Sequence, residues 1–454
     1  MAGPVAAGWT GPTSPAARPR YGSDRLLEKP LYYVPLALLM ATSGFVMFEP
    51  APYDVFSIGV MLLFLIGGMI LTPGIAPLLT LLMMFFASGF VAATQTVSTD
   101  GSYFYIVVTT FLGLNAVFFA FVVAMNPVRA FNVIMAGYVV AGLFTAIAAI
   151  GGYFGAIPFS DSFLLYGRAK GTFQDPNVMG PFLIPPTLFL LSRIIRSRVM
   201  FRLPELGVLL VLVAAIFLSF SRGAWGHMLV SGGLLVFLHF ATARRMMTRI
   251  QILLLAIGGI VFFAVALSGL ASIEHVRTLL AERAHFTQAY DVGEGGRFSR
   301  HIEGAILLAG KPLGLGPREF GYVFTEDPHN TYLKAFSAYG WLAGISYVVL
   351  IISTVTMGAK HCILRTPWQN YFQVAYASFV GLMLLGFIID TDRWRHFWLL
   401  IGLIWGMMAA YPRYARSARG QRPAPGPQKT ATGSLRPPPD AAIDSGGRSV
   451  AQPG

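Results

Sequence analysis

Two neighbouring motifs carry the residue types with the clearest chemistry in this chain. Gly314-Leu315-Gly316-Pro317-Arg318-Glu319-Phe320 is followed by Asp327-Pro328-His329-Asn330 at the start of a long apolar run. An aspartate before a proline is typical of a helix N-cap and the first helical residue, so we expect His329 in the first turn. There the backbone N–H groups are unpaired and the helix dipole is positive. The motif therefore predicts an imidazole that is neutral near pH 7 and can accept a proton, next to a site that can bind a phosphate.

Basic side chains also occur at two further helix starts and in one flexible stretch of the chain. Arg168 and Lys170 precede Asp175-Pro176-Asn177, Arg222 lies in the tight turn 219–223 between two apolar runs, and Arg297 follows the flexible stretch 293–296. The planar guanidinium binds phosphate oxygens with two hydrogen bonds. Arg222 is the most informative, because its short turn keeps it near the hydrocarbon boundary. On insertion scales an unpaired arginine costs about 2.5–3.5 kcal/mol at the centre of a membrane helix and less near the interface. Arg222 is therefore expected to have an anionic partner.

Each of these residues also has a purely structural interpretation. Arg222 could extend to lipid headgroups, and Arg168 and Lys170 could be ordinary loop charges. His329 could bond a backbone carbonyl at the membrane interface. Asn330 is a better candidate for a helix-start hydrogen bond than for catalysis, although we retain it among the substrate-binding candidates.

The last apolar run is preceded by a cluster of charged and aromatic residues. Its arginines, histidine and tryptophans could anchor the chain at the membrane interface. The two aspartates in the cluster could pair with its basic groups. The residues concerned are Asp390, Asp392, Arg393, Trp394, Arg395, His396 and Trp398.

Composition places these motifs in a membrane protein. Of the 454 residues, 55% are hydrophobic and only 12% are charged, whereas soluble domains carry about 25% charged residues. The net charge of +13 does not indicate nucleic-acid binding, because the basic residues fall in short segments between apolar runs. The single Cys362 excludes an internal disulfide and a cysteine-based metal cluster, and no metal-ligand spacing or phosphate-cradling loop is present. No signal peptide is evident.

The expected fold is all-α, a polytopic membrane bundle with about twelve transmembrane helices. The sixth run is short and broken by Pro181, Pro185 and Pro186, so the sequence leaves its helix boundaries open. Apolar runs of suitable length occur at 31–48, 53–72, 75–94, 103–125, 131–151, 178–192, 203–220, 223–241, 250–270, 332–355, 370–390 and 396–411.

The expected organisation has five parts. Residues 1–29 and 413–454 are rich in Pro, Gly, Ala, Ser and Arg and predict disordered tails. Nine helices are expected within 30–270 and three within 332–412. Basic residues concentrate in alternate connections and both tails, which predicts cytoplasmic termini and places the connection 271–331 on the outer, periplasmic side.

The connection 271–331 is expected to contain two amphipathic helices. Ile273, Val276, Leu279 and Leu280 recur at helical spacing, and so do the apolar residues of a second set, Phe298, Ile302, Ile306 and Ala309. Such helices would lie over the membrane surface as a lid above the candidate site. A merely structural cap is the alternative.

These motifs, in this order, resemble the O-antigen ligase and polymerase superfamily of bacterial envelope enzymes. The resemblance covers roughly 165–350, and each motif is short. One departure concerns a tryptophan that many members carry shortly after the Gly-Arg pair, where this chain has Arg300-His301. The matching positions are Arg168, Gly171, Phe173, Asp175-Pro176-Asn177, Ser221-Arg222-Gly223-Ala224, Gly296-Arg297, Pro312-Leu313-Gly314-Leu315-Gly316, Phe320, His329-Asn330, Tyr332-Leu333, Gly340 and Gly344.

The resemblance implies an inverting, metal-independent glycosyltransferase of the bacterial inner membrane that needs no cofactor. Its donor would be a glycan linked to undecaprenyl diphosphate, and its acceptor a lipid A–core type molecule or another glycan. Arg222 and Arg297 would bind the diphosphate with Arg168 assisting. His329 would take the proton from the acceptor hydroxyl or position it, and Lys170 and Asn330 would contact substrate.

Two other functions remain open. A polymerase would join lipid-linked repeat units, and the motifs do not separate it from a ligase. A transporter is disfavoured, because the interiors of the apolar runs are nearly free of charge and no internal repeat is evident. Membrane lipids are expected partners, and nucleic acid is not.

Overall fold

The computed structural model describes residues 26–97, 101–197, 202–270, 272, 274, 277 and 296–420. The chain divides into two compact units, Met1–Arg413 and Tyr414–Gly454. Most of both expected tails, and the first expected amphipathic helix around 273–280, lie outside the described residues. In the second unit the description covers 414–420, which are helical.

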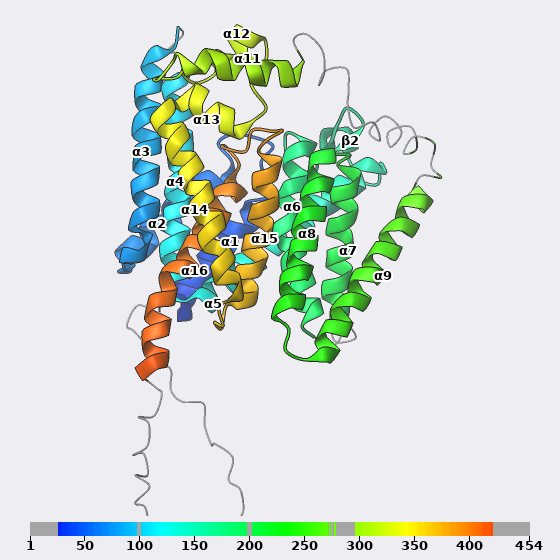
Figure 1. The fold of residues 1–454 in the computed structure, drawn as a ribbon. Coiled ribbons are helices and arrows are strands. Elements are labelled where there is room, and N and C mark those ends of the chain that lie inside the picture. The colour runs from blue at the N-terminus through cyan, green and yellow to red at the C-terminus, as the bar shows by residue number, and fades with distance from the viewer. Residues whose placement is uncertain are drawn as a thin grey trace, which may run out of the picture. The chain divides into compact units, whose positions relative to one another are not determined.

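The described part of the first unit is a bundle of helices with one two-stranded hairpin (Figure 1). The strands are β1 (Leu164–Leu165) and β2 (Arg168–Ala169). The longer helices are α1 (Pro30–Thr42), α2 (Pro52–Ile66), α3 (Ala76–Ala92), α4 (Ser102–Met125), α5 (Pro127–Tyr153), α6 (Pro176–Ile195), α7 (Leu203–Leu218), α8 (Arg222–Thr242), α9 (Met246–Leu270), α11 (Arg297–Ala309), α12 (Glu319–Phe324), α13 (Thr331–Tyr339), α14 (Trp341–Ile363), α15 (Gln369–Leu385) and α16 (Arg395–Gly420).

Six helices in the described part of the chain are long and apolar enough to cross a membrane. They are α4, α5, α6, α8, α14 and the helical stretch Pro73–Gln95 that contains α3. Each expected apolar run contains a helix, and four of these are shorter apolar helices of 10–17 residues: Pro30–Thr42, Pro52–Ile66, Leu203–Leu218 and Met246–Val261. The protein is therefore a helical membrane protein. Helix α16 extends to Gly420, beyond the boundary at 413 expected from composition.

The sixth run, whose boundaries the prolines left open, is a single helix. Helix α6 is continuous from Pro176 to Ile195, although it contains Pro181, Pro185 and Pro186. Proline removes a backbone donor, so Pro186 leaves the carbonyl of Phe182 without its helical partner. The hydroxyl of Tyr138 on α5 donates to this oxygen at 2.8 Å. A neighbouring helix thus supplies the missing hydrogen bond and keeps α6 intact.

The expected span 332–355 is two helices, α13 and α14, which meet at Gly340. This glycine has a φ of +85°, and a Cβ added to it would lie 3.0 Å from the carbonyl oxygen of Leu313. The backbone N–H of Trp341 donates to Pro312 O at 2.9 Å, and that of Leu315 to Ser337 O at 2.8 Å. The stretch 312–316 therefore packs into the corner between α13 and α14, and its role is to orient α13.

Helices distant in sequence lie side by side: α8 against α15, α1 against α5, and α3 against α14. On α16, Gly402 and Gly406 allow close packing, since added Cβ atoms would lie 2.6 Å from the carbonyl oxygens of Ala116 and Ala120 on α4. Small residues four apart let membrane helices approach in this way.

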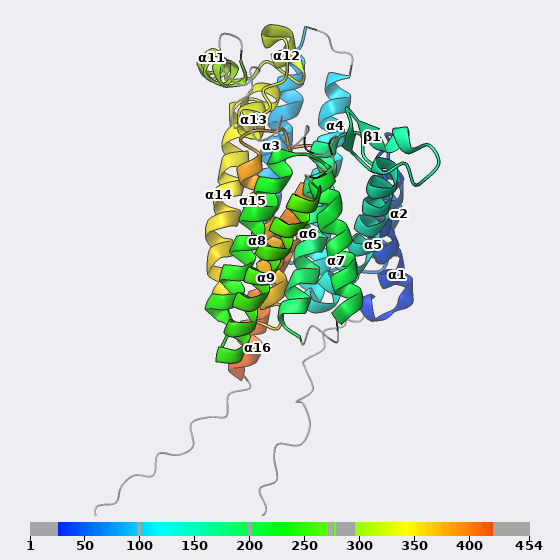
Figure 2. The same ribbon diagram turned by 90° about the vertical axis from the view of Figure 1, so that its right-hand side faces the viewer.

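Helices α11 and α12 lie together above one end of the long helices (Figures 1 and 2). We call this end of the first unit, where α13 begins, the loop end. The second expected amphipathic helix is confirmed as α11. Its packed residues include Arg300, Gly304 and Leu308. The apolar side chains Phe298, Ile302 and Ile306 are exposed instead of packed against the bundle.

Candidate functional site

Arg168 joins two of the motifs. It lies buried on β2, and its Nε donates to Ser219 O at 2.9 Å while an Nη donates to Oδ1 of Asn177 at 2.7 Å. Asp175 is the N-cap of α6 and accepts from the backbone N–H of Asn177 at 2.7 Å. The helix start predicted at Asp175 is therefore confirmed. Arg168 connects this start to the turn that precedes Arg222, and two of its donor groups are used in doing so.

Arg222 is the first residue of α8, as the turn predicts. Ser221 is the N-cap, and its hydroxyl accepts from the backbone N–H of Ala224 at 3.3 Å. The side chain of Arg222 is partly exposed. Lys170 is also partly exposed, and its backbone N–H donates to Phe163 O at 2.9 Å. Both basic groups therefore remain accessible at the loop end.

The predicted helix start at Asp327 is wrong by three residues. Asn330 is the N-cap of α13, and its Oδ1 accepts from the backbone N–H of Leu333 at 3.1 Å. His329 precedes the cap and has a φ of +47°, in the left-handed region. It is thus outside the first turn, and the argument from unpaired N–H groups no longer supports a neutral imidazole. Asp327 leaves the capping position because its carboxylate binds Lys334 at 3.1 Å.

Arg297 begins α11 and lies one turn before His301 on that helix. The Nε2 of His301 is 2.6 Å from Pro328 O, so the ring donates to the residue that precedes His329. Arg300 is buried and forms an ion pair with Glu326 at 2.7 Å. Burial lowers the pKa of His301, and Arg297 and Arg300 add to this effect. The Arg300-His301 pair, which departs from the family pattern, attaches α11 to the segment before α13.

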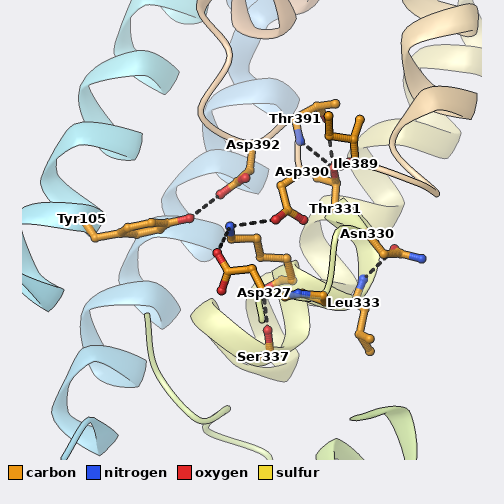
Figure 3. Close-up of polar contacts among 12 residues, drawn as sticks. Tyr105, Asp327, Asn330, Thr331, Leu333, Ser337, Ile389, Asp390, Thr391 and Asp392 are labelled. Atoms are coloured by element: carbon orange, nitrogen blue, oxygen red, sulfur yellow. Dashed lines mark hydrogen bonds and ion pairs between the residues drawn. The ribbon is translucent and has the colours of Figure 1, made fainter. Parts of the chain in front are cut away.

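A buried ionic cluster around Lys334 was not foreseen. Its Nζ lies 3.1 Å from Oδ2 of both Asp327 and Asp390, and it sits 5.8 Å from the centre of the Tyr105 ring (Figure 3). A lysine in an otherwise apolar run was the available signal.

The expected pairing of Asp390 and Asp392 with nearby basic residues is wrong. Asp392 accepts hydrogen bonds from the hydroxyls of Tyr105 and Tyr339 at 3.0 and 2.9 Å. Arg395 instead pairs with Asp54 at the start of α2, where its Nε donates to Oδ1 at 2.8 Å. Trp398 is buried, and its indole N–H donates to Asp392 O at 2.8 Å, so it supports the connection rather than anchoring an interface.

The starts of α8 and α13 both contact the C-terminal end of α15 and the residues just after it. On one side, an added Cβ at Gly223 would lie 2.7 Å from the side chain of Leu385, the last residue of α15. On the other side, the ring of Tyr332 packs on Phe387 at 4.4 Å between centroids, and the backbone N–H of Thr331 donates to Gly386 O at 2.8 Å. The start of α8, which carries Arg222, and the start of α13, which follows His329, therefore both pack at the C-terminal end of α15.

The elements that bear the candidate residues gather at the loop end. The hairpin with Arg168, the start of α8, the helix α11 and the start of α13 all lie there (Figure 1). Within the described ranges, no group of three or more His, Cys, Asp or Glu side chains is placed to hold a metal ion. The arrangement offers arginine side chains and the partly exposed imidazole of His329, which are groups that can bind an anion and move a proton.

A protein-family model described as O-antigen ligase matches residues 207–348. The match contains Arg222, Arg297, His329 and Asn330, whereas Arg168 and Lys170 precede it. No curated protein matches the chain. The match supports the resemblance to the O-antigen ligase superfamily, and together with the apolar helices it indicates an integral membrane protein with a transferase-type role in O-antigen or lipopolysaccharide synthesis.

Proposed function

We propose that this chain, with its match to the O-antigen ligase family, is a membrane glycosyltransferase of the ligase type. It transfers a glycan from undecaprenyl diphosphate to a lipid A–core type acceptor. One observation carries this proposal: the starts of α8 and α13 both pack at the C-terminal end of α15, so the helix start with Arg222 and the residue before the α13 cap, His329, belong to the same part of the loop end within the matched region.

The proposed topology has twelve spans in the inner membrane and both termini in the cytoplasm. A helix occupies each of the twelve apolar runs, although four of these helices are short. The arginines at the opposite end, such as Arg196, Arg244 and Arg245, favour a cytoplasmic position for that end. The loop end, with the described residues 296–331, then faces the periplasm, where α11 forms part of the lid.

The reaction needs a group that accepts a proton and groups that stabilise a diphosphate. His329 takes the proton of the acceptor hydroxyl as its oxygen bonds to the anomeric carbon. The bond from that carbon to the diphosphate oxygen breaks, and the diphosphate leaves with the electron pair. Attack from the opposite face inverts the anomeric carbon. Arg222 and Arg297 bind the departing oxygens, where negative charge grows.

The other candidates have supporting roles in this proposal. Arg168 holds the turn before Arg222 through Ser219 O, so it acts on the diphosphate site mainly by positioning. Lys170 adds positive charge at the loop end. Asn330 uses its Oδ1 as the cap of α13, while its amide nitrogen makes no hydrogen bond to the described residues and can donate to a sugar hydroxyl.

His329→Ala tests the central role. The protein should still insert and fold, while glycan transfer falls about 10²–10⁴-fold, the usual contribution of a general base. Accumulation of lipid-linked glycan in cells is the readout. Unchanged transfer would exclude His329 as the base. Arg222→Lys keeps the charge but loses the two-pronged donor, so wild-type transfer in this variant would show that Arg222 only contacts headgroups.

A gene deletion separates the ligase from the polymerase reaction. If the chain is a ligase, lipopolysaccharide on a gel shows core without attached glycan, while long lipid-linked chains accumulate. If it is a polymerase, the core carries single repeat units and long chains are absent. The second result would replace the proposed acceptor with another lipid-linked repeat unit and keep the same roles for Arg222 and His329.

A further inference from the structure

The segment Glu326–Thr331 is held by contacts at every residue except one. Arg300 binds Glu326, Lys334 binds Asp327, and His301 binds Pro328 O. Asn330 caps α13, and the Thr331 hydroxyl accepts from the backbone N–H of Thr391 at 2.7 Å. His329 alone makes no hydrogen bond or ion pair to the described residues, and its imidazole is half-buried.

The backbone of His329 needs this support. A φ of +47° is unfavourable for a residue with a Cβ, and such a conformation persists only where its surroundings impose it. The contacts on both sides of His329 therefore determine where its imidazole lies. The contact nearest in sequence that involves a charged side chain is the one between Lys334 and Asp327.

Lys334 is suited to fix this segment because it holds two elements at once. Its buried ammonium lies at 3.1 Å from Asp327 in the segment and from Asp390 in the connection between α15 and α16 (Figure 3). The carboxylate of Asp327 is partly exposed, at 39% of its side chain, and no other contact holds it among the described residues. Without the ammonium, this carboxylate would turn to water.

We infer that Lys334 is a positioning residue for His329: by joining Asp327 to Asp390, it fixes the backbone from which the imidazole reaches the acceptor. This inference rests on the proposed function of His329. Since misplacing a reacting group by about 1 Å can reduce rate about 100-fold, loss of the ammonium should affect turnover more than donor affinity.

Lys334→Met tests the inference, because methionine keeps an unbranched apolar side chain and removes the charge. We expect kcat to fall about 100-fold with the KM for the lipid-linked donor within about 3-fold of wild type. Lys334→Arg, which restores a cation, should recover part of kcat. An unchanged kcat in Lys334→Met would overturn the inference.

The matched control is Asp54→Asn, which weakens the ion pair between α2 and α16. This pair is also largely buried, with side chains 15% and 17% exposed, but neither partner contacts the segment before α13. Both variants should lower the thermal midpoint, and only Lys334→Met should lower kcat. If kcat fell equally in both, Lys334 would have only a structural role.

Hydrogen–deuterium exchange distinguishes failure of this inference from failure of the proposed function. In Lys334→Met, the amides of Thr331 and Leu333, which donate to Gly386 O and to Oδ1 of Asn330, should exchange about 10-fold faster than in wild type, with little change in α6. Unchanged exchange would overturn the inference whatever His329 does. If exchange accelerates but His329→Ala transfers glycan normally, Lys334 does fix the segment and the role assigned to His329 is wrong.

A double variant with Asp327→Asn gives an independent check. If Lys334 acts on His329 through Asp327, the two changes share one pathway and their effects on kcat should not multiply. We expect the double variant to be within about 3-fold of Lys334→Met. Full multiplication of the two losses would contradict the inference.

Discussion

Two Asp-Pro segments in this chain have similar local sequence and different structures. At Asp175-Pro176 the aspartate caps α6, and the helix begins at the proline. At Asp327-Pro328 the aspartate does not cap, and the helix begins three residues after the proline with Asn330 as its cap. The first segment joins structural elements, whereas the second leaves one side chain, His329, without a hydrogen bond or ion pair to the described residues.

The difference lies in where a buried cation sits. Arg168 binds neutral oxygens of Ser219 and Asn177, so it leaves the carboxylate of Asp175 free to cap. Lys334 lies seven residues after Asp327 and draws its carboxylate away from the helix start. A local capping signal therefore holds only when no buried charge competes for the capping side chain.

His329→Gly should have the largest effect, and it distinguishes the segment at Asp327-Pro328 from the one at Asp175-Pro176 by its effect on glycan transfer. Glycine adopts positive φ without strain, so the variant should be more stable than wild type by about 1 kcal/mol, while transfer falls about 10²–10⁴-fold. Thermal unfolding in detergent and a transfer assay measure the two effects. Phe159→Gly is the control, because Phe159 also has positive φ, at +58°, and is exposed. It should leave transfer unchanged; equal loss in both variants would contradict the comparison.

Arg168→Met tests the structural role of the first segment. The variant leaves Ser219 O and the Asn177 amide oxygen without their donor. Hydrogen bonds to a charged group contribute about 1.5–3 kcal/mol each, so we expect a loss of about 3 kcal/mol in unfolding free energy. Arg168→Lys should recover only part of it, since one ammonium does not reproduce the fork. A thermal midpoint equal to wild type in Arg168→Met would show that these contacts do not hold the turn.

The caps themselves give a smaller effect. Asp175→Ala and Asn330→Ala should each destabilise the protein by about 1 kcal/mol, because each removes an N-cap acceptor. Asp175→Asn and Asn330→Asp keep an acceptor and should remain near wild type. The midpoint of chemical unfolding is measured for each of these variants and compared with that of wild type. If Asn330→Asp were as damaging as Asn330→Ala, the cap would not explain the start of α13.

The contact between His301 and Pro328 gives the smallest effect, seen in pH dependence. The folded-state pKa of His301 lies below its usual value of about 6.5, so the unfolded chain binds more protons below that pH. Stability from this group is present above pH 6.5 and decreases as the pH falls through the lowered pKa. His301→Gln keeps a donor and does not titrate, so its thermal midpoint should fall less than that of wild type between pH 7 and 5. If the thermal midpoints of His301→Gln and wild type decreased equally between pH 7 and 5, His301 would not be the source of this pH dependence.

The sequence predicted most of the architecture because its signals are local or additive. Each apolar run contains a helix, six helices in the described part of the chain are long and apolar enough to cross a membrane, and the Ser221 and Asp175 starts were confirmed by their caps. The prolines of α6 left its boundaries open, because the hydroxyl that restores its hydrogen bonding comes from Tyr138 on another helix. The single span 332–355 was wrong because packing of Leu313 against Gly340 turns the chain there.

The candidate site, too, was predicted from the sequence only in part. Residue types and charge patterning were enough to bring Arg168, Arg222, Arg297 and His329 to one end of the bundle and to indicate an anion-binding, proton-moving site. Composition alone also established a membrane protein. The partners of these residues were decided by tertiary structure: Lys334 with Asp327 and Asp390, Arg168 with Ser219, His301 with Pro328. A buried charge must find a partner, and the nearest suitable group in space comes from segments that the linear sequence does not connect.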